Sequence, residues 1–212
     1  EAAGTLFGIA AQLAAERRAN PGDDLISAIV ESDVEGGLDD HMIASIFLLF
    51  AVAGNDTTRN STSHGLKLLA DHPDQWRAVK ADPGRLINPM VEEIVRYATP
   101  VIQFRRTATR GVELGGREIA EGDMVVVFYE TANKDETAFE NASTFDVTRD
   151  PNPHVGFGGG GPHFCLGANL ARTQMRDLFT HLAAADVDIE AGDPRYLKSH
   201  FINGIVEMPV SL

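Results

Sequence analysis

The sequence contains one cysteine, Cys165, in a setting that suits a reactive thiolate. Four consecutive glycines precede it in the segment FGGGGPHFCLG, residues 157–167, and a helix is expected to begin close to it. Glycine lets the backbone approach a group closely, and the N–H groups at a helix start stabilise negative charge. A thiolate held in this way can bind haem iron, because the anionic sulfur donates electron density to the metal.

Two other kinds of site have glycine-rich or cysteine-containing segments of this type. A phosphate-binding loop would end in Gly-Lys-Ser/Thr, and a dinucleotide-binding loop would need a preceding strand and spaced glycines; the segment has neither pattern. A buried thiol beside a loop, with no chemical role, is the simpler structural interpretation. The segment alone favours a metal-bound thiolate and leaves a structural cysteine open.

A second group of chemically useful residues lies in AGNDTT, residues 53–58, which continues the longest apolar run. Ala53 and Gly54 are small enough to let a helix backbone approach a flat ring. Thr57 can turn its hydroxyl onto a carbonyl of the preceding helical turn. Asp56 can then act as a general acid in an otherwise apolar site. The alternative is that NDTT only caps a helix end.

The elements that must position these residues follow two patterns. Apolar residues recur at helical spacing over residues 5–98, whereas residues 101–129 contain short β-branched runs between turn signals. A further helix is expected near residues 165–185, followed by extended segments in 196–212. We therefore expect a mainly α-helical fold with a small antiparallel β region, forming part of a single domain over residues 1–212.

The composition excludes several functional classes. With 212 residues, 43% hydrophobic and 23% charged, the chain is globular. Its formal net charge of −13 argues against nucleic acid and anionic membrane surfaces as partners. The apolar run over residues 42–54 is shorter than the ~20 residues of a membrane span. One cysteine excludes an internal disulfide and fits a reducing cytoplasm, so we expect a cytoplasmic protein with a small-molecule role.

The cysteine segment resembles the cysteine loop of the cytochrome P-450 family, the haem-thiolate monooxygenases. Phe157 lies eight residues before Cys165, where many members have seven, and relatives acting on branched lipids and sterols are similar in this respect. The resemblance implies that Cys165 is the axial ligand of a haem b iron and that Phe157 shields its sulfur. It also implies that His163 contacts a haem propionate and that Gly167 belongs to the cofactor-binding loop.

Residues 53–58 resemble the oxygen-activating segment of the same family. The resemblance implies that Asp56 and Thr57 are the catalytic acid and alcohol, which relay protons during dioxygen activation. It also implies that Ala53 and Gly54 lie against the haem.

Two further motifs match the family in order and spacing. Glu93 and Arg96 stand at i, i+3 in VEEIVRY, a bare pattern that usually marks a solvated ion pair. In the family such a pair is buried and joined by a second arginine, a place that Arg149 fills. Arg106, in FRRTAT, resembles the propionate-binding arginine, with Arg105 as its rival.

The resemblance covers the second half of the family's fold, with a long central helix over a Cys-ligated haem. It implies that the N-terminal half of the fold is a missing partner. The implied function is insertion of one oxygen atom from O2 into a C–H bond of an apolar sterol, branched lipid or terpenoid. The residues expected to line the substrate pocket are Val101, Ile102, Phe104, Phe201 and Ile202.

Electrons would come from a ferredoxin-type donor, because the sequence shows no flavin or nicotinamide motif. Arg172 and Arg176 can form a local basic patch for this donor, although a solvated helix face is the plainer interpretation.

Two alternative functions from other classes remain. One is a haem-free, non-enzymatic fragment that self-associates through an exposed apolar face. The other is a haem binder or sensor; Asp56 and Thr57 argue against a haem-thiolate isomerase.

Overall fold

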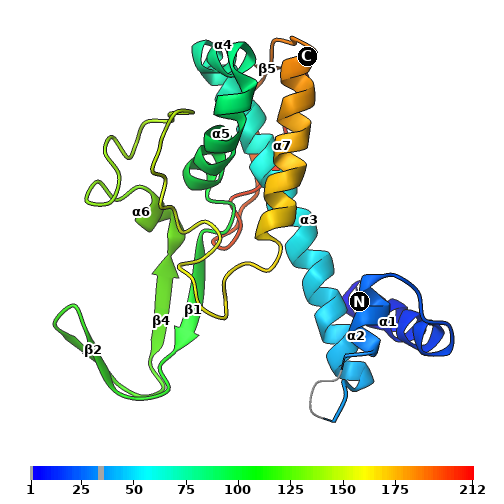
Figure 1. Cartoon of the computed structure of the whole chain (residues 1–212). Coiled ribbons are helices and arrows are strands. Elements are labelled where there is room, and N and C mark those ends of the chain that lie inside the picture. Colours follow the sequence, from blue (N-terminus) through cyan, green and yellow to red (C-terminus); the bar gives the residue numbers. More distant parts are fainter. Residues whose placement is uncertain (1, 33–35) are drawn as a thin grey trace. The chain divides into compact units, whose positions relative to one another are not determined.

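The computed structural model describes residues 2–32 and 36–212. These residues form two compact units that divide between Asp56 and Thr57 (Figure 1). The first unit is helical and contains α1 (Ala2–Ala19), α2 (Leu25–Val30) and the first part of α3 (Asp40–Asp71). Asp24 caps α2 by accepting a hydrogen bond from the Ser27 amide. A small apolar core of Ala14, Ile29 and Ile43 holds this unit together.

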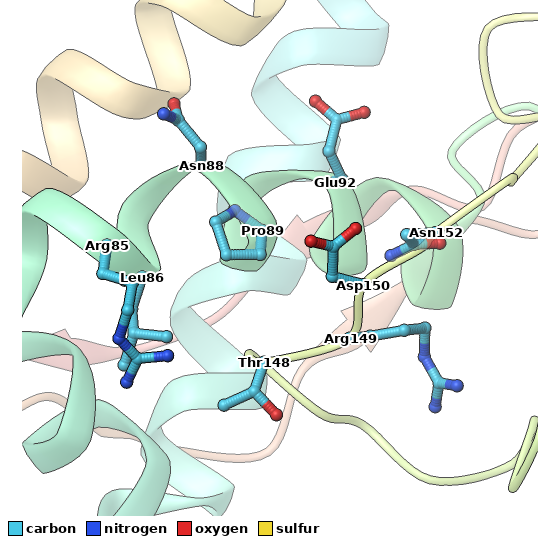
Figure 2. A pocket seen from close by; sticks show the side chains of 9 residues that line it. All are labelled: Arg85, Leu86, Asn88, Pro89, Glu92, Thr148, Arg149, Asp150 and Asn152. Carbon is cyan, nitrogen blue, oxygen red and sulfur yellow. The ribbon is translucent and has the colours of Figure 1, made fainter.

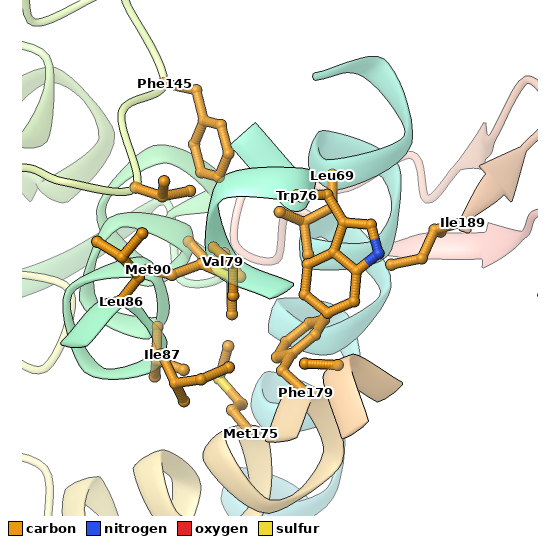
Figure 3. Packing of buried hydrophobic residues seen from close by; sticks show 14 of the residues in the cluster. Leu69, Trp76, Val79, Leu86, Ile87, Met90, Phe145, Met175, Phe179 and Ile189 are labelled. Carbon is orange, nitrogen blue, oxygen red and sulfur yellow. The ribbon is translucent and has the colours of Figure 1, made fainter. Parts of the chain in front are cut away.

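The second unit is built around four helices and a large apolar core (Figure 3). Its helices are the rest of α3, α4 (Pro73–Ala81), α5 (Pro83–Ala98) and α7 (Ala168–Ala184), with the short α6 (Tyr129–Asn133). Prolines at the first positions of α4 and α5 favour helix starts there. The largest fully buried apolar side chains of the core are Trp76, Phe145, Phe179, Leu69, Leu86, Met90, Ile94 and Met175.

Helix α3 packs closely in this core because Gly65 has no side chain. A Cβ at Gly65 would lie 2.8 Å from Phe179 Cζ and 2.9 Å from Ile94 Cδ1. The same part of α3 also binds the C-terminal segment. The Asn60 side-chain oxygen accepts a hydrogen bond from the Ile205 amide at 3.0 Å.

The strands of the second unit pair antiparallel in twos. The pairs are β1 (Gln103–Thr107) with β4 (Met124–Phe128), β2 (Val112–Leu114) with β3 (Arg117–Ile119), β5 (Glu190–Ala191) with β8 (Val210–Ser211), and β6 (Arg195–Tyr196) with β7 (Ile205–Glu207). Gly115 and Gly116 form the β2–β3 turn with positive φ angles of 58° and 74°. The prediction of a mainly helical fold with small antiparallel β regions is confirmed.

Candidate haem-binding site

The cysteine loop folds back on itself and presents Cys165 just before α7. The Gly158 amide donates a hydrogen bond to the Val155 carbonyl at 2.8 Å, and the Cys165 amide donates to the Phe157 carbonyl at 2.9 Å. The Ala168 amide donates to the Cys165 carbonyl at 3.2 Å. The Cys165 side chain is exposed, so the alternative of a buried structural thiol is wrong.

The glycine run is required by the backbone of this loop. Gly158, Gly160 and Gly161 have φ angles of 95°, 92° and 76°, in the left-handed region that glycine occupies without strain. Gly156 meets a different limit, because a Cβ there would lie 2.6 Å from Val95 Cγ1 on α5. The loop therefore needs glycine both to turn and to lie against α5.

We expect Gly156→Ala to destabilise the second unit by about 1–3 kcal/mol, because the added methyl group overpacks the contact with Val95. Gly159→Ala is the matched control, since a Cβ at Gly159 would meet nothing within 4 Å. The control should change the free energy of unfolding by no more than about 0.5 kcal/mol. Urea unfolding of both variants measures the difference, and equal stabilities would contradict the close approach of loop and helix.

The structure brings Glu93, Arg96 and Arg149 together. Arg96 donates two hydrogen bonds to the Glu93 carboxylate, from Nε and Nη2, each of 2.7 Å. Both of these side chains are 0% exposed, unlike the solvated pair that the bare pattern favours. Arg149 Nε lies 3.1 Å from Glu93 Oε2 and adds the third charge. The two-pronged geometry needs guanidinium groups, which a lysine cannot reproduce.

The remaining donors and acceptors of this triad bind the irregular chain before the cysteine loop. Arg96 donates to the carbonyls of Asn133, Ala142 and Thr144 at 2.7, 2.8 and 3.0 Å. Glu93 accepts from the Asp146 amide at 2.9 Å. Hydrogen bonds of this kind offset the cost of burying the charges. The triad thus fixes the path of the chain that leads to the loop.

Figure 2 shows a pocket of about 440 Å³ beside this region, between α5 and residues 148–152. Its lining includes Glu92 and Pro89 from the helix and Asp150 and Asn152 from the opposite segment. No lining residue of this pocket belongs to the segment 157–167 that carries Cys165.

The arginine expected to bind a haem propionate and one residue expected to line the substrate pocket both lie on β1, in the second unit. Arg106 and Phe104 lie on the same face of β1, with the Arg106 guanidinium carbon 5.6 Å from the Phe104 ring centroid. Arg105 points instead toward Met124, with Nη1 3.4 Å from its sulfur. His163 is exposed within the loop.

The five predicted pocket residues are brought together by backbone pairing. Val101 forms an antiparallel bridge with Ile202, and the Ile102 amide donates to the Phe201 carbonyl at 2.9 Å. The rings of Phe104 and Phe201 meet edge to face with centroids 5.3 Å apart. Both rings remain well exposed, as an apolar binding surface requires.

Residues 53–58 lie in the middle of α3, which runs without a break from Asp40 to Asp71. The alternative that NDTT only caps a helix end is therefore wrong. Ala53 and Gly54 are exposed, whereas Asp56 and Thr57 are half-buried. The Thr57 carbonyl accepts a hydrogen bond from Ser61 Oγ at 2.9 Å, a side-chain bond that competes with the helical backbone ladder.

A model of the cytochrome P450 family matches residues 6–184. The chain belongs to the cytochrome P450 family. It is 47% identical to a steroid C26-monooxygenase of Rhodococcus jostii over 207 residues, which are 97% of this chain and 43% of that protein. It is 48% identical to a methyl-branched lipid omega-hydroxylase of Mycobacterium tuberculosis, over 95% of this chain and 48% of that protein.

A solved structure shows the same fold. The Mycobacterium marinum cytochrome P450 in complex with pseudoionone is 53% identical, with a TM-score of 0.95, over 98% of this chain and 50% of that one. The chain thus spans about half the length of the relatives it matches. The prediction of part of the P450 fold is confirmed, and membership implies a haem cofactor.

The residues around Cys165 fit a haem of the P450 type. Phe164, Leu166 and Leu170 flank Cys165 in the sequence. Their side chains are 45%, 84% and 63% exposed, so the residues before and after the thiol both offer apolar surface. Such surface suits a flat apolar ring. Within residues 2–32 and 36–212, no group of three or more His, Cys, Asp or Glu side chains is arranged to hold a metal ion.

Sequence reasoning missed two side-chain amides that hold the chain around this P450 loop. Asn133 is fully buried; its Oδ1 accepts from the Val155 amide at 2.8 Å, and its Nδ2 donates to Thr99 Oγ1 at 3.0 Å. Gln75 donates to the Phe145 carbonyl and accepts from the Val147 amide, at 2.6 and 2.8 Å. Neither residue belongs to a recognisable motif, so no sequence signal marked them.

Sequence reasoning also missed Glu92, which binds two partners. Its carboxylate accepts two hydrogen bonds from Arg172, of 2.6 and 2.8 Å, and one from His154 Nε2 of 3.0 Å. Burial alone would raise the pKa of Glu92, but the hydrogen bonds from His154 and Arg172 lower it to about 2. Arg172 therefore does not act as an open cation. The expected basic patch with Arg176 is weakened, because Glu92 offsets the Arg172 charge.

Proposed function

We propose that the full protein is a haem-thiolate monooxygenase that inserts one oxygen atom from O2 into a C–H bond of an apolar substrate. The exposed Cys165 thiol, on a glycine loop tied to a buried ion-pair triad, is the observation that carries this proposal. Haem b supplies the activation of dioxygen when bound. Residues 1–212 form part of one catalytic domain, and the missing N-terminal half of the fold completes it.

Each cofactor contact has a separate proposed role. Cys165 ligates the iron, and Phe157 shields the sulfur from water. Arg106 and His163 neutralise the propionates; Arg106 is preferred over Arg105 because it shares a face with the apolar Phe104. Ala53 and Gly54 are proposed to lie against the ring itself, and Gly167 to belong to the cofactor-binding loop.

Asp56 and Thr57 are proposed as the proton relay. The Thr57 hydroxyl donates a proton, and Asp56 replaces that proton with one from solvent. Asp56 thus has a general-acid role. Support for this role comes from their adjacent, half-buried positions in the middle of α3.

We expect Thr57→Ala to bind haem and substrate normally but to uncouple the reaction. Product formed per electron consumed should fall roughly 100-fold, the lower end of the usual contribution of positioned proton transfer, while hydrogen peroxide rises. Asp56→Asn should instead slow the whole cycle. Thr58→Ala is the matched control in the same helical turn. Wild-type product per electron in Thr57→Ala, measured with the full-length protein and its donor, would remove Thr57 from the relay.

The proposed substrates are sterols, branched lipids and terpenoids. Support comes from relatives named steroid C26-monooxygenase and methyl-branched lipid omega-hydroxylase. The bridge between Val101 and Ile202 and the Phe104–Phe201 ring contact supply a matching apolar surface.

The electron donor is proposed to be a ferredoxin, and the protein is proposed to be cytoplasmic. Among the described residues, no helix has the length and apolar character needed to cross a membrane.

A visible spectrum of the purified, reduced full-length protein under carbon monoxide tests the proposal. A thiolate-type Soret band supports a haem-thiolate enzyme. The second candidate is a haem-free fragment that self-associates through an exposed apolar face, which the exposure of Met124 (69%), outside the cysteine loop, favours. Absence of haem together with a concentration-dependent increase in molecular mass would overturn the enzyme proposal in favour of this fragment.

A further inference from the structure

Two adjacent carboxylates on α5 hold different parts of the chain around the cysteine. Glu93 binds the segment before the loop, through the Asp146 amide and Arg149. Glu92 binds His154, where the loop begins, and Arg172, seven residues after Cys165. The loop is therefore held at both ends by one helix.

The His154 contact fixes the start of the loop. The Gly156 amide donates a hydrogen bond to His154 Nδ1 at 3.1 Å, so this nitrogen is the acceptor. The proton consequently resides on Nε2, which donates to Glu92 Oε2 at 3.0 Å. The His154 ring then lies with its centroid 5.9 Å from that of Phe157.

Arg172 extends the contact from Glu92 to the cysteine. Its guanidinium makes two hydrogen bonds to Glu92, and its central carbon lies 4.2 Å from the centroid of the Phe157 ring. A cation over an aromatic face at this distance is attracted to it. The Phe157 carbonyl in turn accepts the hydrogen bond of the Cys165 amide. Carboxylate, guanidinium, ring and cysteine form one continuous chain of contacts.

We propose that the Glu92–Arg172 pair is a positioning unit that holds Phe157 beside Cys165, and that its opposite charges cancel at the haem, so that loss of either charge alone shifts the reduction potential of the haem. This inference rests on the proposed ligation of haem by Cys165. It assigns a role to two residues outside the triad and outside the cysteine loop.

The sign of the electrostatic effect follows from simple charge arithmetic. Reduction adds a negative charge at the haem, so a nearby positive charge raises the reduction potential and a nearby negative charge lowers it. The pair is only partly exposed, with side-chain exposures of 25% for Arg172 and 29% for Glu92, which limits screening by solvent. The pKa of Arg172 is raised chiefly by its hydrogen bond to Glu92, so Arg172 stays charged.

Redox titration of the full-length, haem-loaded protein tests the charge effect. Glu92→Gln leaves Arg172 uncompensated and should raise the midpoint potential. Arg172→Gln leaves Glu92 uncompensated and should lower it. The double variant should return close to the wild-type value. Shifts of the same sign in both single variants, or no shift in either, would overturn the electrostatic part of the proposal.

Hydrogen exchange of the Cys165 and Gly158 amides tests the positioning part, in both the loaded and the haem-free chain. Arg172→Lys keeps the charge but loses the paired hydrogen bonds and the flat contact with Phe157, so amide protection should fall while the potential stays near wild type. Unchanged protection would overturn the positioning role.

The control is Glu207→Gln, which breaks the exposed Arg195–Glu207 pair and should alter neither measurement. If the wild-type protein lacks a thiolate-type carbon monoxide band, the ligation of haem by Cys165 fails. The exchange data on the haem-free chain still decide whether the pair positions the loop.

Discussion

Replacing Cys165 with serine is expected to abolish the thiolate signature of the haem completely. A serine hydroxyl is a poor anionic ligand at neutral pH, whereas a cysteine thiol loses its proton readily next to a positive group. Because the chain contains one cysteine, no other thiol in residues 1–212 can replace it. The measurement is the carbon monoxide difference spectrum of the reduced, full-length protein, in which the thiolate-type Soret band should disappear.

The loss should be specific to the ligand and not a result of unfolding. The Cys165 side chain is exposed, so serine leaves no cavity, and the melting temperature of the haem-free chain should stay near wild type. His163→Gln is the matched control in the same loop, since it alters a proposed propionate contact and keeps the sulfur. A thiolate band of normal position and intensity in Cys165→Ser would remove Cys165 as the ligand.

The second large effect is expected at the buried ion pair of α5. Glu93→Gln or Arg96→Lys should destabilise the second unit by about 3–5 kcal/mol. Glu93→Gln leaves two arginines without their carboxylate, and Arg96→Lys keeps the charge but loses the paired hydrogen bonds to Glu93 and leaves buried backbone carbonyls unsatisfied. Both side chains are 0% exposed in the structure. A loss of this size is a large part of the 5–15 kcal/mol that typically stabilises a domain, so soluble protein and haem content should fall together.

The same helix offers a matched control for this prediction. Asp82 and Arg85 form an ion pair at the same i, i+3 spacing, with side-chain exposures of 52% and 65%. Asp82→Asn and Arg85→Lys should each cost less than about 1 kcal/mol. Chemical unfolding of all four variants compares the two pairs. Equal and small losses at both pairs would show that the buried charges contribute no special stability.

The helical part of this fold was accessible from the sequence because its apolar residues recur at helical spacing. Proline fixes a backbone angle that suits the first turn of a helix, so it marks the starts of α4 and α5. Glycine tolerates positive φ angles, so Gly115-Gly116 marks the turn between β2 and β3. Burial of the Glu93–Arg96 pair was not accessible in this way. The pattern alone is typical of solvated pairs, and only the resemblance to the P450 family indicated burial.

Several contacts that the sequence did not predict join a side chain to a backbone group far away in the chain. Gln75 reaches the Phe145 carbonyl across 70 residues, and Asn133 accepts from the Val155 amide across 22. The chain between α6 and α7 has no periodicity that would place its carbonyls. Glu92 and Glu93 are identical in type, and only the helical rotation between neighbouring positions decides which partner each one meets.

The attachment of the cysteine loop to α5 also has a consequence for synthesis on the ribosome. Glu93 precedes its donor Asn152 by 59 residues, and Glu92 precedes Arg172 by 80. At about 5–20 residues per second, the two carboxylates wait roughly 4–16 s for the last of these partners to be made. During this time they remain hydrated, because burying an unpaired carboxylate is too costly. The part of α5 that packs on α7 therefore has no partner until α7 has been translated, and the loop that presents Cys165 can be fixed at both ends only after that.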